Sequence, residues 1–180
     1  MMKKLGLVQV YAGSGKGKTT AACGLAVRAV SHGFRVGWVS FYKDPRHCKR
    51  SEHQALKKLG VKVRFLVKQH PMCVVSKSSA AFKELREVCL KGLNAVRKIY
   101  QHNNLDMLII DEINISVRDG FLKESEVLEI IADKPENLEL VLTGRGATKK
   151  MIAKADLVSI VNEIKHPYSK GVQARKGIEY

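Results

Sequence analysis

Six runs of apolar residues recur along the chain, and within most of them apolar and polar positions do not alternate strictly. These runs cover residues 5–11, 34–41, 61–67, 105–111, 138–142 and 157–161. Runs rich in Val, Ile and Leu without alternation are typical of strands that are buried on both faces of a parallel sheet. The pattern therefore predicts six strands of this kind.

The segments between these runs have the residue spacing of helices. They cover residues 19–31, 51–59, 78–101, 123–132 and 147–153. Strands that alternate with helices predict an α/β fold of three layers, in which helices cover both faces of a mainly parallel sheet of about six strands. At 180 residues the chain has the length of one such domain. We expect residues 1–161 to form it, and the polar, basic residues 162–180 to form a C-terminal tail of the same domain, packed near the functional site.

The composition is that of a globular protein, with 45% hydrophobic and 27% charged residues. Lys and Arg number 32 against 17 Asp and Glu, which gives a net charge of +15 and predicts an anionic partner. No apolar run approaches the roughly 20 residues of a membrane-spanning helix. The four cysteines form no Cys-x-x-Cys motif, which argues against a zinc knuckle or a thioredoxin motif and indicates the free thiols of a cytoplasmic protein.

The strongest chemical signal lies between the first predicted strand and the first predicted helix. Residues 12–19 read Ala-Gly-Ser-Gly-Lys-Gly-Lys-Thr, the [AG]-x4-G-K-[ST] form of the P-loop. Its glycines let successive backbone N–H groups face one concavity, where they and the helix N-terminus attract phosphate. Lys18 offers a mobile charge to phosphate oxygens, and Thr19 offers a hydroxyl ligand to Mg²⁺. The motif predicts nucleotide binding and a fold of the P-loop NTPase type; the structural alternative is a glycine-rich turn that only caps a helix.

Four further charged residues follow predicted strands or the loop. Asp111 and Glu112 end the apolar run 105–111, and we expect this strand to lie beside the first one and to bring its acid next to the Mg²⁺. Arg145 follows the run 138–142 and would face the phosphates or a second substrate, unless it is an ordinary solvated arginine. Arg28, nine residues past Thr19, is open to either interpretation. The sequence contains no Asn-Lys-x-Asp motif for guanine, no kinase catalytic loop and no metal-binding histidine pair.

Several segments together resemble the P-loop type of ATP:corrinoid adenosyltransferase. The segment 13–24, Gly-Ser-Gly-Lys-Gly-Lys-Thr-Thr-Ala-Ala-Cys-Gly, resembles the opening of that family, and similar matches follow at residues 111–113, 143–147, 155–158 and 165–180. The resemblance implies transfer of the 5′-deoxyadenosyl group of ATP to the cobalt(I) of a corrinoid with release of triphosphate, as in adenosylcobalamin biosynthesis or salvage. It also implies a cytoplasmic homodimer that uses Mg²⁺ or Mn²⁺. The basic surface would suit an acidic flavoprotein as reductant.

The family's motifs also imply roles for individual residues. The triphosphate would be held by Gly13, Ser14, Gly15, Lys16, Gly17, Lys18, Thr19 and Thr20. From their places in the loop and after a strand we expect Lys18 and Arg145 to be the catalytic residues, and the resemblance implies that Arg28 contacts the nucleoside end. Thr19, Asp111 and Glu112 would lie on the metal side. Because the attacking cobalt(I) has no proton to remove, the absence of a recognisable general base fits this chemistry.

Between residues 41 and 80 the sequence departs from the family pattern. Relatives carry a Lys-Gly pair after the second strand where this chain has Lys43-Asp44, and an aromatic segment where residues 67–73 contain none. These departures concern the corrinoid and leave the ATP side intact. One alternative is therefore an ATP-binding regulatory protein that has lost corrinoid activity. Another is a nucleic-acid-dependent ATPase, suggested by the basic clusters 43–50 and 57–64, although the aromatic content of 6% speaks against stacking on bases.

Overall fold

The structure is a computed structural model that describes residues 6–43, 52–67, 71, 76, 79–102 and 104–178. Its core is a six-stranded parallel sheet with the order β3-β2-β4-β5-β1-β6. The strands are β1 (Val8–Ala12), β2 (Val36–Ser40), β3 (Lys62–Phe65), β4 (Met107–Asp111), β5 (Glu139–Thr143) and β6 (Leu157–Ile160). All six predicted strands are present, and each begins within three residues of its expected start. Residue 5, the expected start of the first strand, lies outside the described residues.

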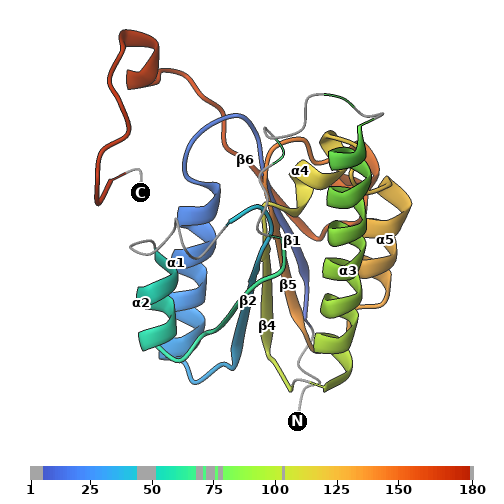
Figure 1. The fold of residues 1–180 in the computed structure, drawn as a ribbon. Coiled ribbons are helices and arrows are strands. Elements are labelled where there is room, and N and C mark those ends of the chain that lie inside the picture. Colours follow the sequence, from blue (N-terminus) through green and yellow to red (C-terminus); the bar gives the residue numbers. More distant parts are fainter. Residues whose placement is uncertain are drawn as a thin grey trace.

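Helices cover both faces of the sheet. They are α1 (Lys18–Ser31), α2 (Glu52–Lys58), α3 (Ala80–His102), α4 (Ile113–Arg118), α5 (Glu124–Ala132) and α6 (Lys149–Lys154), followed by a 3-10 turn, η2 (Pro167–Lys170). In Figure 1, α1 and α2 lie on one face, and α3, α4 and α5 lie on the other. Each face has its own cluster of buried apolar side chains. The predicted three-layer α/β fold is confirmed, while α4 and η2 were not expected.

Burial differs between the centre and the edges of the sheet. All five residues of β2 and of β4 are buried, as are four of the five in β5. The prediction that every strand is buried on both faces is wrong for β3 and β6, whose residues are exposed or half-buried. Both are edge strands with a neighbour on one side only, so their apolar runs were not a sign of full burial.

The strand order also corrects one expectation about the site. β4 does not lie beside β1, because β5 pairs with both: Leu142 is in register with Val10 on one side and with Ile110 on the other. β5 is apolar on both faces and is stabilised by two strand neighbours. The periodicity of a strand does not predict which strands will be its neighbours in the sheet. The carboxyl ends of all three strands nevertheless meet at one edge of the sheet, where parallel α/β sheets bind ligands.

The segment after β6 leaves the sheet and returns beside the start of α1 (Figure 1). Its first residues pack on the loop between β1 and α1, where Val161 O accepts a hydrogen bond of 2.8 Å from Gly15 N. Farther along, Lys16 Nζ donates to Ile178 O over 3.0 Å. Within the described residues, no helix combines the length and the apolar character needed to cross a membrane.

Candidate functional site

The loop of residues 13–17 connects β1 to α1 through a backbone that only glycine adopts easily. Gly13 and Gly17 have φ angles of +106° and +123°. A Cβ atom on Gly13 would lie 2.3 Å from Val161 O, and one on Gly15 would lie 2.8 Å from the carbonyl carbon of Asn162. The loop glycines are therefore required both by the turn and by the close approach of the segment after β6.

Lys18 begins α1 and is only 8% exposed. Its ammonium donates to Gly15 O over 2.5 Å, so it points back into the concavity of the loop. Burial lowers the pKa of Lys18, Glu112 opposes this shift, and the positive charge of Arg145 adds to it. A lysine held in this way offers its charge to an anion in the loop at little cost in side-chain entropy.

Asp111 connects the loop to the end of β5. Its side chain is fully buried, and Oδ1 accepts hydrogen bonds from Thr143 Oγ1 at 2.7 Å and from Thr19 Oγ1 at 3.0 Å. Thr143 ends β5, so the carboxylate reaches the loop across the strand that separates β4 from β1. The structure thus brings Asp111 and Thr19 together by a different route from the one expected.

Glu112 follows directly, in a backbone conformation that is uncommon for a residue other than glycine. Its φ is +66°, and its N–H donates to Thr143 Oγ1 over 3.0 Å. Such strained positions persist where the surroundings hold them, often at functional sites. Burial raises the pKa of Glu112 and the adjacent Asp111 carboxylate raises it further, whereas three cations lower it: Lys43, Lys18 and Arg145.

The turn after β5 supports this arrangement. Gly144 has a φ of +127°, and a Cβ atom there would lie 3.2 Å from Cβ of Asn114 and 3.3 Å from Cα of Glu112. The buried Asn114 donates from Nδ2 to Gly144 O over 3.2 Å. Arg145 follows as an exposed residue within electrostatic reach of Glu112 and Lys18.

The donor set at this edge of the sheet consists of hard oxygen atoms. The hydroxyl of Thr19 is bonded to Asp111, and the Glu112 carboxylate is within electrostatic reach of Asp111, a set of oxygens that suits Mg²⁺ or Mn²⁺ completed by phosphate oxygens and water. No group of three or more His, Cys, Asp or Glu that could hold a metal by itself occurs among the residues that the structure describes.

Comparison with known proteins shows which family has this sequence. A model of the family described as ATP:corrinoid adenosyltransferase BtuR/CobO/CobP matches residues 4–180. The chain belongs to this family. The corrinoid adenosyltransferase of Escherichia coli K12 is 31% identical over 97% of this chain and 86% of its own length, and that of Pseudomonas aeruginosa is 30% identical over 97% and 84%. The resemblance that the motifs indicated is confirmed.

A solved structure shows how general the fold is. The KaiC-like protein PH0186 of Pyrococcus horikoshii superposes with a TM-score of 0.59 over 90% of this chain and 75% of its own, at 18% identity. At that identity the likeness concerns the fold alone. It agrees with the P-loop type of three-layer α/β fold that the sequence predicts.

Arg28, which we expect at the nucleoside end of ATP, stands apart from the phosphate loop. Arg28 lies exposed in the last turn of α1, ten residues beyond Lys18 and so about 15 Å along the helix axis. The segment 67–73, where relatives carry an aromatic stretch, lies outside the described residues except for Val67 and Pro71.

Ser40, His53 and Glu52 form a group of polar side chains that their spacing along the sequence did not predict. Ser40 Oγ lies 3.0 Å from Nε2 of His53, whose Nδ1 is 4.0 Å from Oε1 of Glu52. Ser40 and His53 are both buried, and Ser40 Oγ also accepts a hydrogen bond of 2.9 Å from Trp38 Nε1. Because no substrate reaches this serine and its hydroxyl is already bonded, we assign the group to the core and not to catalysis.

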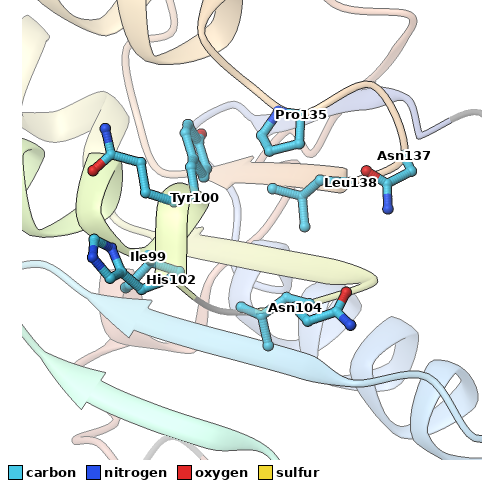
Figure 2. A pocket seen from close by; sticks show the side chains of 9 residues that line it. Ile99, Tyr100, His102, Asn104, Pro135, Asn137 and Leu138 are labelled. Carbon is cyan, nitrogen blue, oxygen red and sulfur yellow. The ribbon is translucent and has the colours of Figure 1, made fainter.

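A cavity of about 310 Å³ lies at the amino ends of the strands, opposite the phosphate loop (Figure 2). It is lined by the end of α3, including Tyr100, and by the segments that precede β4 and β5, including Leu105 and Leu138. These are the amino ends of the strands, so the cavity is remote from the phosphate loop. Because the P-loop motif of the family lies at the carboxyl ends of the strands, we place the candidate site there and not in this cavity.

Proposed function

We propose that the chain transfers the 5′-deoxyadenosyl group of ATP to the cobalt(I) of a corrinoid and releases triphosphate. The single observation that carries this proposal is the phosphate loop of a chain that the family model matches over residues 4–180, with Lys18 inside the loop and Thr19 bonded to the buried Asp111. Relatives named corrinoid adenosyltransferase align with nearly the whole chain.

The reaction makes modest chemical demands on the protein. The cobalt(I) substrate supplies an electron pair to C5′ of ATP, the C5′–oxygen bond breaks, and that bonding pair leaves with the triphosphate. The cobalt becomes formally cobalt(III), and no proton has to be removed from the nucleophile. The protein must therefore position the two substrates and stabilise the negative charge that grows on the triphosphate.

The residues of the carboxyl edge suit this work. In the proposal residues 13–20 hold the triphosphate, and Lys18 and Arg145 are catalytic residues that stabilise the leaving charge. Thr19, Asp111 and Glu112 would hold Mg²⁺ or Mn²⁺, which would neutralise part of the triphosphate charge when bound. Arg28 would contact the nucleoside end.

The C-terminal tail, residues 162–180, is proposed to be part of the same domain and site. Glu163 N donates to Ser14 Oγ over 3.3 Å, and Ile178 O accepts from Lys16. Both contacts join the tail to side chains of the phosphate loop, and they support this part of the proposal. A homodimer in the cytoplasm, with an acidic flavoprotein reductant drawn to the net charge of +15, completes the proposal.

An anaerobic absorbance assay tests the reaction. Cobalt(I) cobalamin, ATP and Mg²⁺ should lose the cobalt(I) band in proportion to the triphosphate released, and the same assay with cobinamide reports which corrinoid is accepted. Lys18→Ala is the control and should react much more slowly. If the wild-type chain binds ATP with no transfer to either corrinoid, the proposal is wrong and a regulatory ATP-binding role takes its place.

A further inference from the structure

Lys43 is a charged residue beside Asp111 whose role the sequence did not predict. It follows β2, and its Nζ lies 2.8 Å from Oδ2 of Asp111 and 3.2 Å from Oε1 of Glu52 on α2. Asp111 is fully buried, and Oδ2 accepts no well-aligned hydrogen bond among the described residues. The ammonium of Lys43 is thus the counter-charge of this oxygen, and a buried carboxylate without one would be strongly unfavourable.

The backbone before Lys43 is built to deliver it there. Tyr42 has a φ of +60°, which is uncommon for a bulky residue, and it turns the chain sharply after β2. Its ring is buried, and its hydroxyl donates to Ser116 Oγ on α4 over 2.7 Å. Packing therefore holds Tyr42 in a strained conformation whose result is the contact between Lys43 and Asp111.

The two oxygens of Asp111 are consequently divided between different partners. Oδ1 accepts from the hydroxyls of Thr19 and Thr143, while Oδ2 faces the ammonium of Lys43. The hydroxyl oxygen of Thr19 keeps a lone pair for a cation while it donates its proton to Asp111. Glu112 is half-buried at the same end of the sheet, and the nearby cations act on its carboxylate electrostatically.

We propose that Lys43 is a positioning residue that keeps Oδ2 of Asp111 paired with an ammonium, so that Asp111 acts on a divalent cation through the Thr19 hydroxyl while Glu112 meets the cation directly. This inference rests on the proposed function, since it concerns the cation that accompanies the triphosphate. In this role Lys43 would weaken the attraction of the two adjacent carboxylates for a divalent cation, because one of them already has a cationic partner.

The experiment measures the affinity of the full chain for Mn²⁺ alone, without nucleotide, from the electron paramagnetic resonance signal of free Mn²⁺. Lys43→Met removes the charge, and Lys43→Gln removes it while keeping an N–H that can donate to Oδ2. Both variants free Asp111 beside Glu112, so each should bind Mn²⁺ at least about tenfold more tightly than the wild-type chain. Lys91→Met, at an exposed position of α3, is the matched control and should leave the affinity unchanged.

The double variant Lys43→Met with Asp111→Asn identifies the carboxylate responsible. It should return to the weak Mn²⁺ binding of the wild-type chain, because the oxygen that Lys43 covers no longer belongs to a carboxylate. A merely structural role of Lys43 would lower stability without creating a tighter Mn²⁺ site. Should Lys43→Met fail to fold by circular dichroism, Lys43→Gln carries the same comparison.

Two results would overturn the inference. One is unchanged Mn²⁺ affinity in folded Lys43→Gln, and the other is a gain that persists after Asp111→Asn. The proposed function fails separately: a wild-type chain that transfers no adenosyl group can still show the Mn²⁺ gain in the variants. Conversely, transfer by the wild-type chain without that gain would leave the function in place and remove the role of Lys43.

Discussion

The two ends of the candidate site are built in different ways. At the carboxyl ends of β1, β4 and β5, side chains are buried and joined by hydrogen bonds, with Asp111 accepting from two hydroxyls and pairing with Lys43. In the segment after β6, Ile164 is 86% exposed and Tyr168 is 68% exposed, and contacts with the loop involve mainly backbone atoms. The carboxyl ends of the strands are thus held by buried side chains of the core, whereas the segment after β6 is largely exposed.

Removing Asp111 should produce the largest effect on stability. Asp111→Ala leaves Lys43 without its buried partner and two hydroxyls without their acceptor, so we expect the free energy of unfolding in urea to fall by about 3 to 5 kcal/mol. Glu129→Ala breaks an ion pair of the same 2.8 Å length with Arg97, at the surface of the molecule, and should cost about 1 kcal/mol or less. Equal losses would contradict the claim that burial makes the central pair important.

The close approach of the tail to the loop can be tested with two glycines. Gly13→Ala would place a Cβ atom 2.3 Å from Val161 O at a φ of +106°, and should destabilise the chain by about 2 kcal/mol or more. Gly24→Ala adds the same atom within α1, where nothing lies within 4 Å, and should stabilise by roughly 0.5 to 1 kcal/mol. Thermal or urea unfolding of both variants measures the contrast in sign, and a neutral Gly13→Ala would mean that the loop and the residues after β6 do not touch in solution.

The same contrast explains what sequence alone could predict. The path from β1 through the loop to α1 is local, so the glycine spacing and Lys-Thr pair placed it within one residue. The insertion of β5 between β1 and β4 is a tertiary choice, which no periodicity carries. Likewise α4 reads Ile-Asn-Ile-Ser-Val-Arg, whose β-branched residues favour strands, and it forms where Glu112 turns the chain and Asn114 bonds to Gly144.

The residues of the site divide along the same line. The spacing of motifs along the chain predicts the chemistry of four residues: Lys18, Thr19, Asp111 and Glu112. Lys43 does not, because its contact with Asp111 depends on a left-handed tyrosine before it, a conformation that tyrosine rarely adopts. Thr143 was part of the family segment 143–147, but its own role was not predicted. Its hydrogen bond to Asp111 arises from the register of β5 beside β4.

Lys18→Ala should weaken the binding of tripolyphosphate, measured by calorimetry, by about tenfold to a hundredfold, as expected when a charged hydrogen bond to the ligand is lost. Lys16→Ala is the matched variant: this lysine of the same loop is exposed, and its ammonium donates to Ile178 O in the tail. Its loss should change the affinity several-fold less. If the two variants weaken binding equally, the direction of the Lys18 side chain into the loop is not what matters, and the loop acts only through its total charge.

The smallest change in stability is expected from shortening the tail. A variant that ends at Glu163 keeps the contacts of residues 161–163 with the loop and removes exposed side chains such as Ile164 and Tyr168, so the free energy of unfolding should stay within about 1 kcal/mol of the full chain. Its affinity for tripolyphosphate should also be nearly unchanged, because Lys18 and the loop glycines are packed independently of the removed residues. A loss above about 2 kcal/mol would place the tail with the core. That result would make the two ends of the site a single cooperative unit, in which loop and tail fold together.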